Sequence, residues 1–130
     1  MSADRRLVSS GSPYEARYGY SRAVAVADSC WVAGTTDAGP DGRSLHPGDA
    51  AAQARAAFAI AIGALEEAGF AVGDVVRTRM FIVRPEDAAA VAAVNGELFG
   101  AIRPAATLVR VAGLIDPSML VEVELDARRG

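Results

Sequence analysis

Three carboxylates near the C-terminus are the most evident candidates for chemistry in this sequence. Glu122, Glu124 and Asp126 alternate with aliphatic residues between positions 121 and 126. This period of two predicts a strand with one apolar face and one acidic face. If the fold buried the acidic face, its carboxylates would need partners or water, because desolvating a charge is costly. The pattern leaves two alternatives open: a solvated acidic face, or a face from which one carboxylate looks into a cleft.

Few other residues have distinctive chemistry. Cys30 is the only cysteine and His46 is the only histidine. A single cysteine excludes an intrachain disulfide and a thiolate metal cluster within one chain. Cys30 lies in an apolar segment, where we expect an inert thiol, and His46 lies in the loop-like GRSLHPGD, where we expect a solvated side chain. We therefore expect no metal site and no cofactor.

Composition narrows the class of protein. A length of 130 residues favours a single domain over 1–130, and a hydrophobic content of 52% suffices for a core. The net charge is −3, and no basic stripe is interleaved with aromatic residues, which disfavours nucleic acid as the main partner. The sequence has no signal peptide, lipidation motif or membrane-spanning apolar run. We expect a soluble, cytoplasmic protein with no membrane partner.

The first part of the chain predicts a hairpin behind an irregular segment. Residues 1–19 show no periodicity, and we expect them to form a lead-in that wraps a surface or fits between subunits. Segments 21–26 and 30–33 are apolar on either side of a turn, which predicts two paired strands. A long loop follows over residues 37–48.

The strongest helix signal begins at Asp49, which can cap the N-terminus, and ends at Gly69. One face carries apolar residues at helical spacing, namely Ala54, Phe58, Ala61, Ile62 and Leu65. Three polar residues are assigned elsewhere on the helix, namely Gln53, Arg55 and Glu66. The apolar side of this helix should therefore cover a sheet.

The remaining chain predicts a strand over 75–83, a second helix over about 86–99, and two strands over 105–111 and 119–125. The order ββ-α-β-α-ββ argues for an α+β sandwich with both helices on one face of a single sheet. Several strands have aliphatic residues on both faces, more than a solvated face normally carries. We therefore expect the uncovered face to meet another subunit of a homo-oligomer.

The order and spacing of several motifs resemble the YjgF/RidA family of reactive intermediate deaminases, whose older label is L-PSP endoribonuclease. The motifs are Gly19–Tyr20, VAGTT at 32–36, AAQAR at 51–55, EEAGFAVGDVVRTRMFI at 66–82, RPAATLV at 103–109 and VEVELDA at 121–127. The resemblance implies a chorismate-mutase-like fold with one mixed sheet. It also implies a homotrimer in which three sheets form a central barrel, with small-molecule clefts between adjacent subunits.

The resemblance further implies hydrolysis of imines or enamines, such as 2-aminoacrylate, to 2-keto acids and ammonia. Members that do this hold the substrate carboxylate with an arginine, which grips it through two parallel hydrogen bonds. Here the arginine position is Ala106, and a frequent cysteine two residues later is Leu108. A frequent asparagine of the second helix corresponds to about Ala92. We therefore expect an atypical substrate.

Other positions of the family motif are retained. Tyr20, Gly34 and Glu122 match, and the resemblance implies that Glu122 positions the attacking water. The resemblance also implies that the backbone around Ala33, Gly34 and Thr107 lines the cleft.

Three arginines are candidates to replace the lost anchor. Arg110 shares the strand parity of Ala106 and Leu108 but lies roughly 13 Å from Ala106, so it could bind only a differently placed anion. Arg22 and Arg79 are the other two, and surface charge is the alternative role for all three. The single tryptophan of the chain either packs in a core or interface or forms an aromatic wall of the cleft.

Three functions are compatible with these residues. The first is a deaminase for an imine-like or enamine-like metabolite, with Glu122 as the water-positioning base. The second is a non-catalytic trimer that binds a small metabolite, which the missing arginine favours. The third, an endoribonuclease, is the weakest because the chain is acidic and lacks a basic cleft. The retained family positions favour the first, with the second as its alternative.

Overall fold

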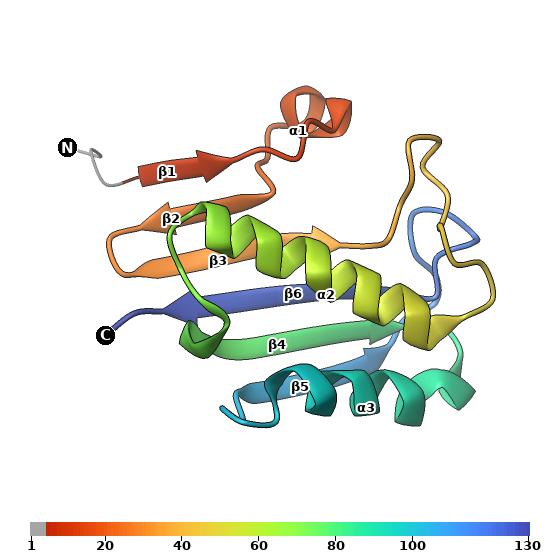
Figure 1. Cartoon of the computed structure of the whole chain (residues 1–130). Coiled ribbons are helices and arrows are strands. Elements are labelled where there is room, and N and C mark those ends of the chain that lie inside the picture. Colours follow the sequence, from red (N-terminus) through yellow and green to blue (C-terminus); the bar gives the residue numbers. More distant parts are fainter. Residues whose placement is uncertain (1–4) are drawn as a thin grey trace.

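A computed structural model describes residues 5–130 as one six-stranded mixed sheet in the order β1-β2-β3-β6-β4-β5 (Figure 1). The strands are β1 Arg5–Val8, β2 Ala23–Val26, β3 Ser29–Thr35, β4 Val75–Ile82, β5 Ala105–Arg110 and β6 Val121–Arg128. All neighbouring strands are antiparallel except β4 and β5, which are parallel. The expected α+β fold with one mixed sheet is confirmed.

Two long helices cover one face of this sheet, as expected (Figure 1). They are α2 Ala50–Glu67 and α3 Ala88–Phe99. Asp49 caps α2 by accepting a hydrogen bond from the Ala52 amide, and Gly69, with φ of 93°, follows its end. A short 3₁₀ turn, Pro85–Asp87, precedes α3, so the second helix begins two residues later than predicted. A similar turn, Val72–Asp74, leads into β4.

The lead-in segment contains two elements that its sequence did not reveal. Beyond residues 1–4, which lie outside the described residues, it forms strand β1 and the short helix α1, Pro13–Tyr18. Ser12 caps α1, and Gly19 ends it in the left-handed conformation. Strand β1 is a four-residue edge strand with three exposed residues, so it needs no apolar alternation. The edge strand and the helix together border the helix-free face of β2.

The hairpin of β2 and β3 is confirmed, but the two C-terminal strands are not neighbours. Strand β4 lies between them, pairing with β5 on one side and with β6 on the other. The reason is burial: alternate side chains of β6 are fully covered, which suits a central strand, whereas those of β5 are exposed or half-buried, which suits an edge.

The placement of Gln53 outside the apolar face of α2 is wrong. Gln53 is fully buried, its Nε2 donates to the carbonyls of His46 and Ser118, and its Oε1 accepts from the Leu120 amide at 2.8 Å. Buried polar groups are tolerated when they are hydrogen-bonded, and here one amide satisfies three backbone groups. Gln53 lies one helical turn before the buried Ala57, so the two side chains are on the same face of α2. Its position in the helix, and not its polarity, therefore determines that Gln53 is buried.

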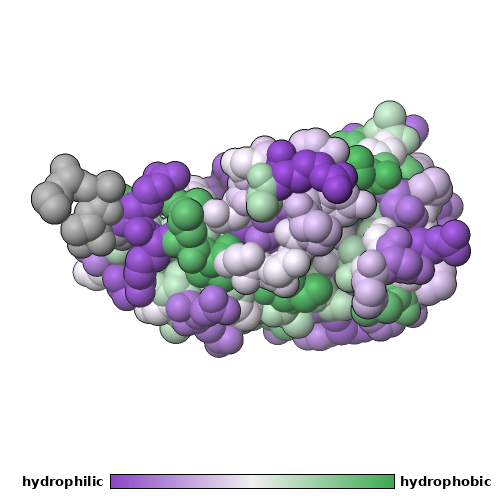
Figure 2. Space-filling model, turned by 90° about the horizontal axis from the view of Figure 1, so that it is seen from above, coloured by the Kyte–Doolittle hydropathy of each residue, from purple (hydrophilic) through white to green (hydrophobic). Residues whose placement is uncertain are grey.

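Figure 2 shows the molecule from the side of β1 and α1, where hydrophobic surface forms separate patches among polar residues. Exposed large side chains on the helix-free side of the sheet include Leu7 and Trp31. Within the described part of the chain, no helix has the length and hydrophobicity needed to cross a membrane.

Candidate functional site

Strand β6 separates its side chains as the sequence predicts. Val121, Val123 and Leu125 are buried beneath the helices, and the three alternating carboxylates lie on the opposite face. The carboxylates are half-buried rather than freely solvated, and their surroundings differ. The structure therefore matches the second alternative: Glu122 faces a cleft, which Glu124 also lines, while Glu124 and Asp126 pair with Arg79.

Glu122 faces a shallow cleft of about 560 Å³, here called the Glu122 cleft. Its lining residues are Tyr20, Ala33, Gly34, Phe81, Val111, Gly113, Leu114, Glu122 and Glu124. Four residues that the sequence singled out, Tyr20, Ala33, Gly34 and Glu122, thus come together from three separate segments of one chain. The sheet brings them together because β6 pairs with β3, where Ala33 and Gly34 lie.

Gly34 makes room for the close approach of the Glu122 carboxyl group. A Cβ atom on Gly34 would lie 2.5 Å from Glu122 Oε2, nearer than real Cβ contacts allow. The register of β3 and β6 shifts between Val32 and Thr35, at this glycine. The absence of a side chain therefore creates the space in which the carboxyl group sits.

The environment of Glu122 changes its acidity. Burial raises the pKa of its carboxyl above the ordinary value, the charge of Glu124 raises it further, and the charge of Arg22 partly opposes both. No side chain among residues 5–130 donates a hydrogen bond to it. A carboxyl group with a raised pKa and no hydrogen-bond donor on it is suited to take up and return a proton.

Arg22 is neither an anchor lining the Glu122 cleft nor a surface charge. Its guanidinium donates to the carbonyl of Gly34 and to Thr35 Oγ1 at 3.0 Å, and it lies 3.6 Å from the Glu15 carboxylate. Burial raises the pKa of Glu15, but hydrogen bonds from Ser10 and Ser9 and the charge of Arg22 outweigh it, so the pKa is lowered overall. The ion pair ties the α1 segment to the strand that carries Gly34.

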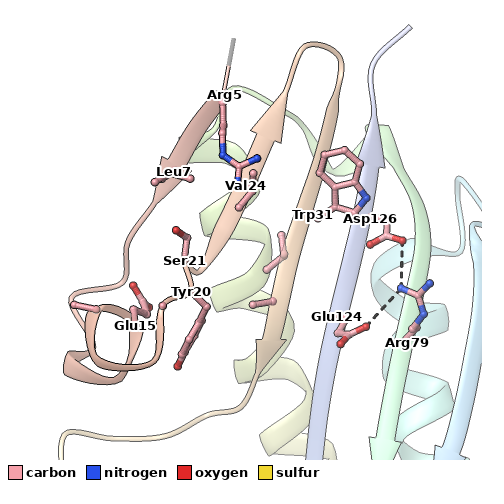
Figure 3. Close-up of a pocket in the computed structure, with 14 residues that line it drawn as sticks. Arg5, Leu7, Glu15, Tyr20, Ser21, Val24, Trp31, Arg79, Glu124 and Asp126 are labelled. Atoms are coloured by element: carbon pink, nitrogen blue, oxygen red, sulfur yellow. Dashed lines mark hydrogen bonds and ion pairs between the residues drawn. The ribbon is translucent and has the colours of Figure 1, made fainter. Parts of the chain in front are cut away.

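Arg79 lies on the helix-free face and pairs with the two carboxylates beyond Glu122. Its Nη1 is 3.5 Å from Glu124 Oε1 and 3.2 Å from Asp126 Oδ2 (Figure 3). Trp31 lies beside Asp126 and is about half exposed, on the wall of a larger groove of about 870 Å³. The carboxylates on this side of the groove share Arg79 as an ion-pair partner, whereas Glu122 has none among residues 5–130, so the smaller Glu122 cleft is the stronger candidate site.

The family's anchor positions lie apart from the Glu122 cleft within this chain. The parallel register of β4 and β5 pairs Ala106, Leu108 and Arg110 with residues of β4 that are buried beneath the helices. Thr107 lies on the helix-free side and accepts a hydrogen bond from Arg77 at 2.7 Å. None of these four residues lines the Glu122 cleft.

Helix α3 contains one asparagine, Asn95, three residues after Ala92. Ala92 is exposed, whereas Asn95 is half-buried and hydrogen-bonds to Thr78 of β4 at 2.8 Å. This contact joins α3 to the sheet. It lies on the helix-covered side and contributes nothing to the Glu122 cleft.

His46 is exposed, as expected of a loop residue, but it also has a buried partner. Its Nδ1 lies 3.0 Å from Oδ2 of Asp37, which is fully buried and also accepts from the hydroxyl of Ser44. His46 therefore fastens the loop to the body of the protein, although its ring is partly exposed. Cys30 is buried, which raises the pKa of its thiol and matches an inert role. Residues 5–130 hold no group of three His, Cys, Asp or Glu side chains placed to bind a metal ion.

Sequence reasoning missed the apolar wall of the Glu122 cleft, which consists of Phe81, Val111 and Leu114. The sequence predicts only that Phe81 belongs to a strand, and Val111 and Leu114 follow the end of β5. Alternation on β4 does place Phe81 opposite the buried face, and its register partner is Glu122. That pairing was not visible before the strand order was known.

Comparison with known proteins gives one family. The family model described as endoribonuclease L-PSP matches residues 11–129. An uncharacterized protein of Streptomyces coelicolor is 42% identical over 125 residues, which span 96% of this chain and 92% of that protein. The crystal structure of Rv2704 from Mycobacterium tuberculosis, a member of the highly conserved YjgF/YER057c/UK114 family, has 42% identity and a TM-score of 0.86, covering 96% of this chain and 99% of that chain.

A solved structure with a bound ligand is also similar. E. coli TdcF with bound serine has 25% identity and a TM-score of 0.77, covering 96% of this chain and 94% of that chain. With the fold, the matched residues and these relatives in agreement, the chain belongs to the YjgF/RidA family, the family of the endoribonuclease L-PSP model.

Proposed function

We propose that this protein hydrolyses an imine-type or enamine-type metabolite to a carbonyl compound and ammonia, with Glu122 as the general base. The observation that carries the proposal is the half-buried Glu122 carboxyl, which has a raised pKa and faces a cleft beside Gly34. The substrate differs from 2-aminoacrylate because the carboxylate-binding arginine is replaced by Ala106.

The reaction needs only water and one proton carrier. The oxygen of water bonds to the carbon of a protonated imine, the π electron pair moves to nitrogen, and Glu122 takes the proton released by water. Return of that proton to the nitrogen of the carbinolamine lets the C–N bond break with its electron pair on nitrogen. Ammonia leaves and takes up the hydroxyl proton, so the products are a ketone or aldehyde and ammonium.

The proposal includes a homotrimer whose clefts lie between subunits. The helix-free face supports this assembly, because it carries half-exposed apolar residues such as Leu7 and Trp31. The Glu122 cleft is shallow in the single chain, and a neighbouring subunit would deepen it. Light scattering after gel filtration tests the assembly, since a monomer in solution contradicts it.

Small-molecule binding is supported by a relative, and RNA binding is not supported by the charges. TdcF, a similar structure, is described with bound serine, a small metabolite. The Glu122 cleft is lined by two carboxyl groups and no arginine, an arrangement that repels phosphates. The description of the family as an endoribonuclease therefore gains no support from this site.

The test generates imines in place and follows their decay. Oxidases acting on a panel of amino acids and simple amines supply the imines, and decay is measured with and without the protein. We expect acceleration for part of the panel, its loss in Glu122→Gln, and its retention in Asp126→Asn, a matched change on the same face of β6. Equal turnover in wild type and Glu122→Gln overturns the role of Glu122.

A second candidate is a metabolite-binding trimer without catalysis. The observation that favours it is the placement of Ala106 where catalytic relatives have their anchor. It predicts saturable binding of a small molecule with no acceleration of imine decay across the panel. Release of ammonia above the uncatalysed rate excludes it as a complete account.

A further inference from the structure

We propose that the ligand of the Glu122 cleft is an imine or amine with a cationic or neutral nitrogen, an alkyl or aryl substituent and no carboxylate. This inference deepens the proposed function by naming the substrate class of the same cleft, and its catalytic part rests on that function. It is carried by the charges and the apolar side chains that line the cleft.

The walls of the cleft that this chain supplies include two carboxyl groups and no arginine. Glu124 is paired with Arg79, whereas Glu122 has no ion-pair partner among residues 5–130. The sequence contains no lysine, so all 13 of its Lys or Arg positions are arginine. An anionic ligand would meet the unpaired carboxyl group of Glu122, whose like charge costs affinity, whereas a cationic nitrogen would be attracted by it.

The nearest arginines are already engaged. Arg22 is bound to Glu15, to the Gly34 carbonyl and to Thr35, and it does not line the cleft. Arg79 is shared between Glu124 and Asp126. Freeing Arg22 would leave the buried Glu15 carboxylate without its ion-pair partner, and freeing Arg79 would do the same to two half-buried carboxylates.

The arginines of the β5 side are not available within the chain either. Arg77 donates to Thr107 at 2.7 Å, two strands away from the β3 wall of the cleft. Arg110 is paired in register with Ile82, whose side chain points beneath the helices, so its direction is opposite to that of Glu122. The lost anchor at Ala106 is therefore not replaced from this chain.

The rest of the lining is suited to an apolar substituent. Tyr20, Phe81, Val111 and Leu114 line the cleft, and Phe81 is the register partner of Glu122 on the neighbouring strand. A carboxyl group beside aromatic rings is a favourable environment for a cationic nitrogen, because the faces of the rings attract cations. The same rings can hold an alkyl or aryl group by excluding water from it.

Three probes of matched shape test the ligand class without any catalytic step. Benzylammonium, benzyl alcohol and benzoate share a ring and differ in charge. Their dissociation constants are measured by calorimetry with the full-length protein at neutral pH and low salt. We expect benzylammonium to bind at least about tenfold more tightly than benzoate, with benzyl alcohol between them.

Two variants add the same charge at adjacent positions. Leu114→Arg places a guanidinium in the wall of the cleft, and we expect it to reverse the preference so that benzoate binds more tightly than benzylammonium. Ile115→Arg is the control, because Ile115 is 95% exposed and does not line the cleft. We expect the control to retain the wild-type preference, and thermal unfolding of both variants verifies that they are folded.

Several results would overturn the ligand class. They are benzoate binding as tightly as benzylammonium in the wild type, no measurable binding of any probe, or a preference that Leu114→Arg leaves unchanged. Tight benzoate binding that disappears in Arg110→Ala would show that a neighbouring subunit supplies the missing anchor.

Failure of the ligand class and failure of the proposed function give different results. If the protein prefers benzylammonium but accelerates the decay of no imine, the proposed ligand class is supported and the proposed hydrolysis is contradicted. If amino-acid imines decay faster than amine-derived imines, the ligand class is contradicted and the hydrolysis is supported. Faster decay of the benzylamine-derived imine, lost in Glu122→Gln, supports both.

Discussion

The two faces of β6 place residues of one strand in opposite environments. On one face Val121, Val123 and Leu125 are buried under α2 and α3, and on the other Glu122 and its two acidic neighbours border open grooves. The covered face gains stability from excluded water, whereas the open face keeps partly desolvated charges that oppose stability. The comparison teaches that the covered face holds the fold together, whereas the open face holds the site of the proposed chemistry.

The largest effect should come from opening the covered face. Leu125 is fully buried, so Leu125→Ala removes apolar contact and leaves a cavity, and we expect a loss of about 2–5 kcal/mol in the free energy of unfolding. Urea denaturation measures it. Ile115→Ala is the control outside the covered face, because Ile115 is 95% exposed, and we expect about 0.5 kcal/mol or less. A loss at Ile115 as large as that at Leu125 would break the comparison.

The next-largest loss of stability is expected at Gln53, the buried polar residue on the helix-covered side of the sheet. Gln53→Ala leaves the Leu120 amide and two carbonyls without their buried partner, so we expect a loss on the order of 3 kcal/mol in urea denaturation. Arg55→Ala, two residues later on the same helix, breaks an exposed ion pair with Glu97 and should change little. Similar results for the two variants would mean that Gln53 is not the link between α2 and β6.

A smaller effect on stability, with a large effect on function, is expected at Gly34. Gly34→Ala displaces the end of the flexible Glu122 side chain rather than backbone, so we expect a loss of about 1 kcal/mol or less. Binding of benzylammonium should fall by about tenfold, since the carboxyl group leaves its place. Calorimetry and thermal unfolding separate the two readouts. Gly63→Ala in α2 has open space around it and should gain about 0.5–1 kcal/mol without altering binding.

The smallest effect is a pH dependence with opposite signs at two glutamates. The pKa of Glu122 is raised above 4.5, so the folded state binds the proton of this carboxyl group more tightly than the unfolded state does. Ionised Glu122 therefore destabilises the folded state, and this destabilisation grows as pH rises from 4.5 through the folded pKa. Glu122→Gln should therefore unfold at a higher temperature than wild type at pH 7, and this advantage should vanish below pH 4.5.

Glu15 supplies the contrasting case. Its pKa is lowered from 4.5, so its stabilising effect is present above that value and is lost as pH falls through the folded pKa. Glu15→Gln should unfold at a lower temperature than wild type at pH 7, with a difference that shrinks in acid. Thermal melts over a pH series compare the two variants. The same sign at pH 7 for both would contradict the environments assigned to them.

Much of the covered face could be predicted from local pattern. The alternation of β6, the cap at Asp49 and the aliphatic spacing of α2 are properties of adjacent residues, and each is found in the structure. The same reasoning failed at Gln53, because its partners are backbone groups of distant segments. Strand β1 and helix α1 were missed because neither needs an apolar periodicity.

The sequence by itself determined the family, the α+β class and which side of β6 is acidic, because these depend on residue order and a period of two. Only the tertiary structure decided which of these carboxylates is ion-paired and which is left without a partner. Glu122 and Glu124 have the same type and the same strand face, but β3 brings Gly34 against the first, and β4 brings Arg79 to the second. The physical reason is that solvation and pairing depend on neighbours that are distant in sequence.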